Sequence, residues 1–449
     1  MIELLIVLVG AAIVFACFHA GVTRTTIVVG LFSMILVPRA LFALIPDGGA
    51  LHVGISSFTP AVTTYGLAVM VGVAVLALRW GFPREVLIWI PFMIWLVVGW
   101  STEWAAGPVL VSGLMQYALG IFAWVFGATL GQRLIHSADV RRLVCTVVLI
   151  ALSVQVFVVV LQAVGIPINP MSASNLAQLP GRFNGTLGHP NDLGKVVILV
   201  LVVALPLHAT RQGVTFSRQL LVTLGSGFLV LFATGGRAVT VGAAVMVLFW
   251  VLLQPGLPQA RTHKARALVA ALVGGGAIAI ALAGRFEEDP TGGARGVLSE
   301  LATQQIALRP LWGTGPNQYV EVVGAFDALT ASGVPVHNSF LLAVAELGIP
   351  GAVLLSLPFV VVILKALFSI RSTTERGVWG RVIVAACPAL IVIGATGWGL
   401  LGSYVFPLLC LAFGAAAGSM RREPRAERLR SLDADTELFH HTTKRGVRP

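Results

Sequence analysis

Residues 335–351 read PVHNSFLLAVAELGIPG, and the apolar run that begins here extends to residue 364. A histidine and an asparagine lead directly into an apolar helix, with no run of charges between them. This pattern predicts a membrane helix whose first residues lie at the boundary between lipid and water. His337 at that boundary could transfer a proton near neutral pH, whereas Asn338 could simply cap the helix. The motif alone leaves both interpretations open.

The composition of the whole chain indicates a polytopic membrane protein. Of its 449 residues, 57% are hydrophobic and 11% are charged, and the mean hydropathy is +0.91. Soluble domains carry about 25% charged residues. The net charge of +11 does not point to nucleic acid, because membrane proteins collect positive residues in their cytoplasmic loops.

The cysteines and the N-terminus add two expectations. All four cysteines lie in apolar runs without metal-ligand spacing, which predicts small buried side chains. They are Cys17, Cys145, Cys387 and Cys410. The first apolar run follows Met1-Ile2-Glu3 without a positive segment before it, so we expect no cleavable signal peptide.

About thirteen apolar runs are long enough to span a bilayer, which takes roughly 17–25 residues each. We expect a break at Pro350 in the run that follows His337, so the fold class is all-α with about 12–13 transmembrane helices. The expected helices cover residues 2–20, 25–45, 61–79, 86–101, 109–130, 142–165, 192–210, 218–234, 238–254, 267–284, 339–364, 382–397 and 400–419.

Loop charges predict the orientation of the chain. Alternate loops and the C-terminal tail are basic, whereas the loops near 46–60 and 102–108 contain no lysine or arginine. The basic residues are Arg24, Arg79, Arg84, Arg133, Arg141, Arg142, Arg211, Arg218, Arg261, Lys264, Arg266, Lys365, Arg371, Arg376 and Arg381. By the positive-inside rule these loops are cytoplasmic, so the N-terminus lies outside and the C-terminus inside.

Two outer loops are long, near 166–191 and 285–338, and long loops on one side often carry function. The second contains a short amphipathic helix predicted over 294–308. The domain organisation follows from these loops. It comprises an N-terminal helix bundle (1–165), a core with outer arginines (166–284), the long outer loop (285–338), C-terminal helices (339–420) and a disordered basic tail (421–449).

Three outer arginines, Arg182, Arg237 and Arg309, run against the insertion bias. A single outer arginine often only reaches toward lipid headgroups. Arg237, however, follows two glycines in a very short turn, where backbone can approach a bound group. Guanidinium groups hold phosphate oxygens with two parallel hydrogen bonds, so two arginines could bind a diphosphate without metal. Lys195 could add a further positive charge.

A metal site is the alternative for phosphate binding. Glu287-Glu288-Asp289 could hold Mg²⁺ or Mn²⁺, but an acidic cluster beside Pro290 and two glycines is more often a solvated loop. We therefore expect no metal and no cofactor.

Four segments, in this order, resemble the O-antigen ligase family of bacterial polytopic glycosyltransferases, which includes O-antigen polymerases. Together they cover roughly residues 180–355. They are Arg182–Gly194 with its His-Pro-Asn, Gly236-Arg237, Arg309–Pro316, and His337–Leu341 followed by Glu346-Leu347-Gly348 and Gly351.

The resemblance implies a GT-C-like helix bundle in the bacterial cytoplasmic membrane with its active site on the outer face. It implies a metal-independent, inverting transfer from a glycan on polyprenyl (undecaprenyl or decaprenyl) diphosphate to an acceptor hydroxyl. The acceptor would be a glycan, a glycolipid or another cell-envelope molecule, and membrane lipids would surround the site. By position, His337 would be the general base, and Arg182 and Arg237 would hold the diphosphate.

The remaining site residues have weaker roles. We expect Arg309 and Lys195 to assist donor binding, and Asn191, Asn338 and Glu346 to support the local geometry. Three alternatives stay open: a polysaccharide polymerase of the same family, a transporter or flippase for a lipid-linked saccharide, and a scaffold for envelope assembly.

Overall fold

The computed structural model describes residues 21–36, 40–43, 60–169, 171, 179–210, 213–214, 217–255 and 294–421. Several predictions lie outside these residues: the helices at 2–20 and 267–284, the acidic cluster at 287–289 and the tail beyond residue 421.

The described residues are mainly helical, which confirms the all-α polytopic class. The helices are α2 (Val22–Leu36), α3 (Thr64–Trp80), the 3₁₀ helix η1 (Arg84–Trp89), α4 (Ile90–Thr102), α5 (Pro108–His136), α6 (Ala138–Ala163), α8 (Pro190–Leu207), α9 (Arg218–Thr234), α10 (Arg237–Leu253), α12 (Arg295–Leu308), α13 (Tyr319–Gly324), α14 (Ala328–Ala331), α15 (Ser339–Ser369), α16 (Glu375–Thr396) and α17 (Val405–Ser419). Two short antiparallel pairs complete the described structure: β1 (Ala40–Ala43) with β2 (Ala61–Thr63), and β3 (Ala209–Thr210) with β4 (Gly213–Val214).

Six of the described helical segments are long and apolar enough to cross a membrane, and five shorter helices are also apolar. Some of the predicted helix bounds were wrong. The helix predicted over 25–45 ends at Leu36, with the strand β1 at 40–43, and the helix predicted over 400–419 begins at Val405. The helix predicted over 382–397 begins at Glu375, so Arg381 lies inside α16 and not in a loop. Its side chain is only 2% exposed, and its guanidinium donates to Gln254 Oε1 and to two backbone carbonyls. These partners allow a charged residue inside an apolar bundle.

The centre of the bundle is α8, whose residues are almost all buried. It is apolar on every side, as expected of a helix surrounded by other helices. Beside it, α17 packs closely along α5. A Cβ added to Gly127 or to Gly418 would overlap a backbone carbonyl of the opposite helix. Small residues of this kind let membrane helices approach each other.

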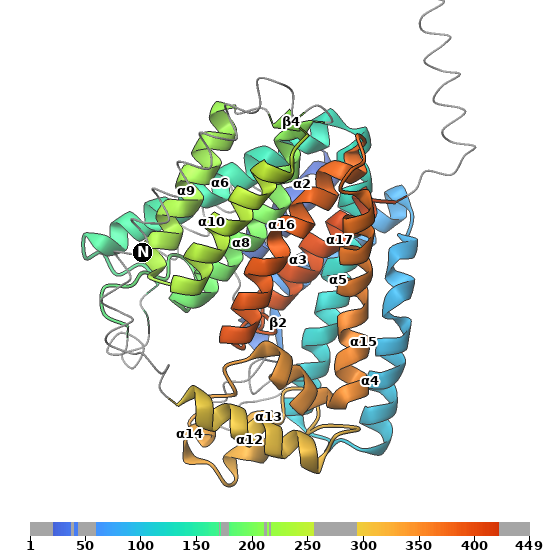
Figure 1. Cartoon of the computed structure of the whole chain (residues 1–449), viewed down its shortest axis with the longest axis vertical. Coiled ribbons are helices and arrows are strands. Elements are labelled where there is room, and N and C mark those ends of the chain that lie inside the picture. The colour runs from blue at the N-terminus through green and yellow to red at the C-terminus, as the bar shows by residue number, and fades with distance from the viewer. Residues whose placement is uncertain are drawn as a thin grey trace, which may run out of the picture.

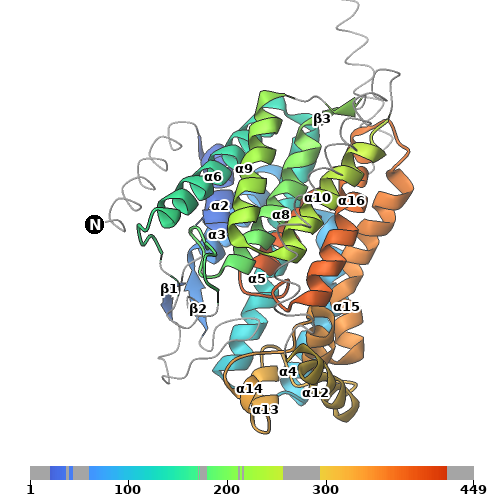
Figure 2. The ribbon, with the colours of Figure 1, turned by 60° about the vertical axis from the view of Figure 1, so that its left-hand side comes forward.

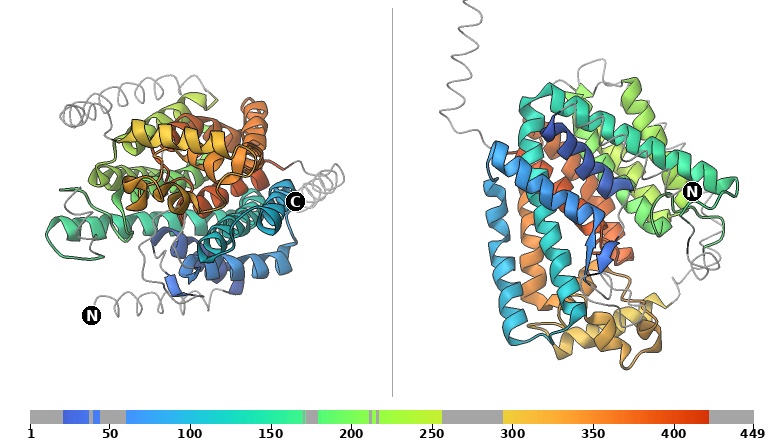
Figure 3. Two further views of the ribbon diagram at one scale, coloured as in Figure 1. Left: turned by 90° about the horizontal axis from the view of Figure 1, so that it is seen from below. Right: turned by 180° about the vertical axis from the view of Figure 1, so that it is seen from behind.

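The helices α12, α13 and α14 lie at one end of the bundle, at the bottom of Figure 1, and we call this the site end. A second view shows α12–α14 at the same end, below α15 (Figure 2). Seen from below, α12 lies across the ends of the other helices (Figure 3). The predicted amphipathic helix at 294–308 is confirmed as α12.

The long helix α15 is broken at Gly348, where φ is 71° and ψ is 172°. The predicted break at Pro350 was therefore two residues too late. Glycine adopts a positive φ without strain, so the break occurs at Gly348. Pro350 then lies in the first turn of the following segment, where a missing N–H costs little.

The loop at residues 309–318 fills this break. Its contacts replace the helical hydrogen bonds that the break removes, as backbone groups inside a membrane protein require. Three backbone hydrogen bonds join the two segments: Thr314 N to the Ala345 carbonyl (2.9 Å), Gly315 N to the Glu346 carbonyl (2.8 Å) and Ile349 N to the Pro310 carbonyl (2.8 Å). On the same loop, Trp312 stacks on Trp95 with ring centroids 4.2 Å apart.

Candidate functional site

Asn338 caps α15 at the site end. Its side-chain oxygen accepts hydrogen bonds from the N–H groups of Phe340 (2.9 Å) and Leu341 (3.1 Å). Its backbone is extended, which is typical of an N-cap residue. The capping interpretation therefore applies to Asn338, and it places His337 immediately before the helix.

His337 is half-buried, and its Nδ1 atom is enclosed. Among the described residues no group bonds Nδ1 with good geometry, although the Pro335 carbonyl is close enough to favour the protonated ring. Burial lowers the pKa of His337 below its ordinary value of 6.5, and the positive charges of Arg295 and Lys195 lower it further. The imidazole is therefore held in its neutral form near neutral pH.

Arg182 is fixed against the turn between α9 and α10. Its Nε atom donates to the Thr234 carbonyl (2.6 Å), and its terminal nitrogen donates to the Asn191 side chain. The turn is tight because Gly235 adopts a left-handed conformation, with φ of 62°. Arg237 follows directly as the first residue of α10 and is half-buried. Arg182 and Arg237 are thus brought to the same turn.

Asn191 links Arg182 to the start of α8. Its own N–H donates to the Nδ1 atom of His189 (3.1 Å), which caps the helix. Burial lowers the pKa of His189, Asp192 opposes this, and the charges of Lys195 and Arg182 add to the lowering. A neutral His189 keeps the acceptor lone pair that the cap requires.

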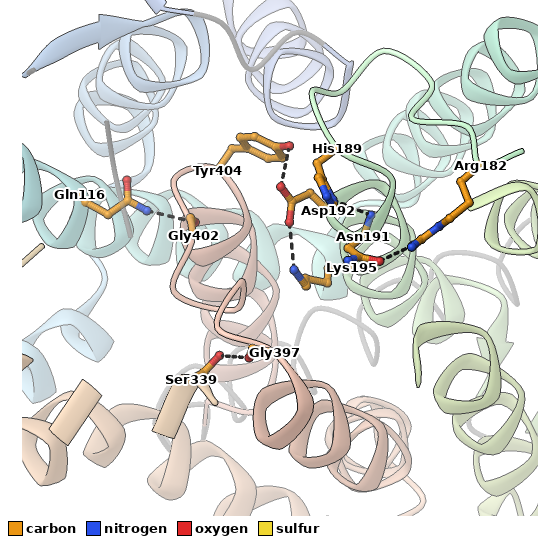
Figure 4. Close-up of polar contacts among 10 residues, drawn as sticks. All are labelled: Gln116, Arg182, His189, Asn191, Asp192, Lys195, Ser339, Gly397, Gly402 and Tyr404. Carbon is orange, nitrogen blue, oxygen red and sulfur yellow. Dashed lines mark hydrogen bonds and ion pairs between the residues drawn. The ribbon is translucent and has the colours of Figure 1, made fainter. Parts of the chain in front are cut away.

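Lys195 forms an ion pair with Asp192, and its Nζ atom lies 2.9 Å from the carboxylate. Lys195 is only 8% exposed, and burying an ammonium group requires such a partner. The second oxygen of Asp192 accepts a hydrogen bond from the Tyr404 hydroxyl (3.3 Å). Figure 4 shows this cluster beside His189, Asn191 and Arg182.

Sequence reasoning missed Asp192, Tyr404 and Arg295. The spacing of Asp192 and Lys195, three residues apart at a helix start, could have indicated their ion pair. No sequence signal points to Tyr404, which lies 212 positions away from Asp192. Arg295 is the first residue of α12, and its positive charge acts on His337.

Arg309 and Glu346 lie apart from this cluster. Arg309 is exposed at the end of α12, and within the described part of the chain its side chain makes no hydrogen bond or ion pair with the cluster. Glu346 is fully buried, and its Oε2 atom accepts the Asn317 N–H (2.9 Å). Glu346 therefore holds the 309–318 loop in the break of α15.

Metal ligands do not gather in the part of the chain that the structure describes: no three His, Cys, Asp or Glu residues there could hold an ion. The candidate cluster at 287–289 lies outside that part. The described site instead has four positive side chains, of which Arg295 and Lys195 act on His337 and Arg182 and Arg237 lie at the turn between α9 and α10.

A helix bundle with a cationic site at one end defines a polytopic membrane protein that can bind an anionic substrate. Residues 220–356 match the family described as O-antigen ligase, and Arg237, Arg309 and His337 lie within the match. This match confirms, over the matched residues, the resemblance seen in the sequence. The apolar helices make it a multi-pass membrane protein, and the matched family is one of O-antigen ligases. Among curated proteins, none matches the chain.

Proposed function

We propose that this protein transfers a glycan from polyprenyl diphosphate to an acceptor hydroxyl, with inversion and without metal. The observation that carries the proposal is the contact of Arg182 with the turn between α9 and α10, directly before Arg237. This turn lies at the same end of the bundle as His337 (Figure 1). Two guanidinium groups at one turn suit the two phosphate groups of such a donor.

Arg182 and Arg237 stabilise the leaving group. When the bond between the sugar and the diphosphate breaks, negative charge develops on the phosphate oxygens. Fixed positive groups in a partly dry site stabilise that charge without reorganising. The bonds from Arg182 to Thr234 and Asn191 set the plane of its guanidinium before the donor arrives.

His337 removes the proton of the acceptor hydroxyl. Because Nδ1 is enclosed, Nε2 is the nitrogen that meets the acceptor. The acceptor oxygen attacks the anomeric carbon, its proton passes to Nε2, and polyprenyl diphosphate departs. A single displacement of this kind inverts the anomeric centre. General bases typically contribute about 10²–10⁴-fold to a rate.

The site faces the outside in this proposal. The opposite end of the bundle carries the basic connections, including those at Arg84, Arg141 and Arg218, and the positive-inside rule assigns them to the cytoplasm. The acceptor is a glycan, a glycolipid or another envelope molecule. A growing glycan as acceptor would make the protein a polymerase, with the same chemistry at His337.

The test is glycan transfer by the purified protein in proteoliposomes, with a polyprenyl-diphosphate glycan as donor. His337→Ala should keep donor binding and lose transfer by about 10²-fold or more. Arg237→Ala should weaken donor binding and lower the rate of transfer. Arg218→Ala, at the opposite end, is the matched control and should change neither. Full transfer by His337→Ala, or movement of the donor across the bilayer without any transfer by the natural protein, would contradict the proposal.

A further inference from the structure

The loop at residues 397–404, between α16 and α17, joins the separate parts of the site. We propose that this loop is a positioning element, in which Gly399 and Tyr404 hold the Asp192–Lys195 pair at a fixed place relative to Arg182 and His337. The inference rests on the proposed transfer function. It assigns roles to two residues far in sequence from the matched motifs.

The first contact of the loop is with the His337 side of the site. The Ser339 hydroxyl donates to the Gly397 carbonyl (2.7 Å), and Ser339 is two residues after His337 (Figure 4). Ser339 is the first residue of α15 and is buried. The start of α15 is thereby tied to the first residue of the loop.

The second contact is with the donor side. Tyr404 donates its hydroxyl proton to Asp192, whose other oxygen holds Lys195. Burial raises the pKa of Tyr404 far above its usual value, and the Asp192 charge raises it further, so this hydroxyl stays protonated. Asp192 follows Asn191, which holds Arg182.

The loop is itself anchored to the core of the bundle. The Gln116 side chain of α5 donates to the carbonyls of Gly402 (3.2 Å) and Ser403. Gln116 is buried, so these bonds are shielded from competing water. The loop is thus fixed to α5 through Gln116, to the start of α15 through Ser339 and to the Asp192–Lys195 pair through Tyr404.

Gly399 restricts the position of the lysine directly. A Cβ added there would overlap the Lys195 ammonium and would lie 3.2 Å from Asp192 Oδ1. The backbone of Gly399 is outside the left-handed region, so alanine would add no backbone strain. The clash falls on the end of a flexible side chain. Gly399→Ala therefore displaces the ammonium while leaving the charge and the fold in place.

A lysine side chain ordinarily samples many rotamers, and ordering it costs free energy at each encounter with a ligand. Here the loop supplies that order in advance. The ammonium charge then acts at one place on the diphosphate and on His337. A misplacement of about 1 Å in a catalytic group can lower a rate by about 10²-fold.

The test is a double-mutant cycle of Gly399→Ala and Lys195→Met, read as kcat and as KM for the lipid-linked donor. Each single variant should lower transfer at least about tenfold, and the double variant should be no worse than Lys195→Met alone. Gly225→Ala, where an added Cβ meets nothing within 4 Å, is the control. Independent, multiplying effects would overturn the positioning role, because Gly399 would then act without Lys195.

Tyr404→Phe gives a second arm. It should lower kcat, whereas Tyr117→Phe should not, because the buried Tyr117 hydroxyl has no hydrogen-bond partner among the described residues. Equal effects of the two variants would overturn the role of Tyr404. If the natural protein transfers no glycan, the proposed function fails. The cycle is then read on binding of polyprenyl diphosphate, where non-additive losses would still support the positioning loop.

Discussion

The Nε atom of Arg182 donates a 2.6 Å hydrogen bond to the carbonyl of Thr234, which lies 52 positions later in the chain. This bond brings Arg182, from the loop before α8, to the turn that directly precedes Arg237. Two arginines that are distant in sequence thereby lie at one turn.

Arg182→Lys should weaken donor binding although the charge is kept. A lysine ammonium cannot donate to Thr234 and Asn191 and still present a planar pair of donors to phosphate. We expect a loss of about tenfold or more in donor affinity, since charged hydrogen bonds contribute about 1.5–3 kcal/mol each. Binding of radiolabelled polyprenyl diphosphate measures it. Arg218→Lys is the control, and an unchanged affinity of Arg182→Lys would refute the bidentate role.

The pH dependence of transfer should report the lowered pKa of His337. The base works only when neutral, so activity should persist as the pH falls through 6.5 and should decline below it. Arg295→Ala removes a positive charge that disfavours the imidazolium, so the acidic limb should move to higher pH. Lys195, the other charge that acts on His337, remains in this variant. A limb that stays in place or moves to lower pH would show that Arg295 does not act on the base.

Gly348→Ala should destabilise the protein. Its φ of 71° suits glycine, and an added Cβ would overlap the Leu311 carbonyl of the docked loop. Strained positions of this kind cost about 1–3 kcal/mol, before the loop is displaced. Thermal unfolding in detergent should show a lower Tm than for Gly225→Ala, whose Cβ meets nothing within 4 Å. Equal Tm values would mean that the break at Gly348 is not required.

Arg381→Met should also lower the Tm while leaving the kinetics of the folded protein unchanged. The substitution removes the hydrogen bonds that Arg381 donates to Gln254 Oε1 and to the Ile370 and Ser372 carbonyls. We expect this loss to cost about 2 kcal/mol or more. These groups lie at the end opposite to His337. Arg142→Met, at an exposed position, is the control. A change in the donor KM of the folded fraction would contradict a purely structural role.

Excess chelator should leave transfer intact, because the proposal assigns charge stabilisation to arginines. Loss of activity that Mg²⁺ or Mn²⁺ restores would instead support a metal at Glu287-Glu288-Asp289. Replacement of these three residues by Asn and Gln would then have to abolish the metal response.

The helices could be predicted from the sequence because each is encoded locally. A segment inside a bilayer must satisfy its own backbone groups, so most of the long apolar runs become helices. The run predicted over 25–45 is an exception, because its residues 40–43 pair with β2 as a strand. The run predicted over 218–234 is α9, with the same bounds. The prediction failed at Arg381, which hydropathy assigns to a loop. Arg381 is instead buried in the bundle, because Gln254 and the Ile370 carbonyl accept its hydrogen bonds.

The position of the break in α15 shows the limit of local reasoning. The sequence predicts that Pro350 breaks the helix. In the structure the break is at Gly348, where the 309–318 loop packs against α15. Which residue breaks the helix depends on that distant loop, whose carbonyl at Pro310 receives the Ile349 N–H.

His337, Arg182, Arg237 and Lys195 could be predicted as site residues from the sequence because their residue types conflict with a membrane setting and therefore stand out. Their arrangement was not accessible in the same way. The bond from Tyr404 to Asp192 and the approach of Gly399 to Lys195 join segments about two hundred positions apart. Hydropathy and charge act along the chain and determined the helices, the class of protein and the candidate residues. Hydrogen bonds and close packing act across space, so only the tertiary structure decided how the loop at 397–404 contacts Ser339, Asp192 and Lys195.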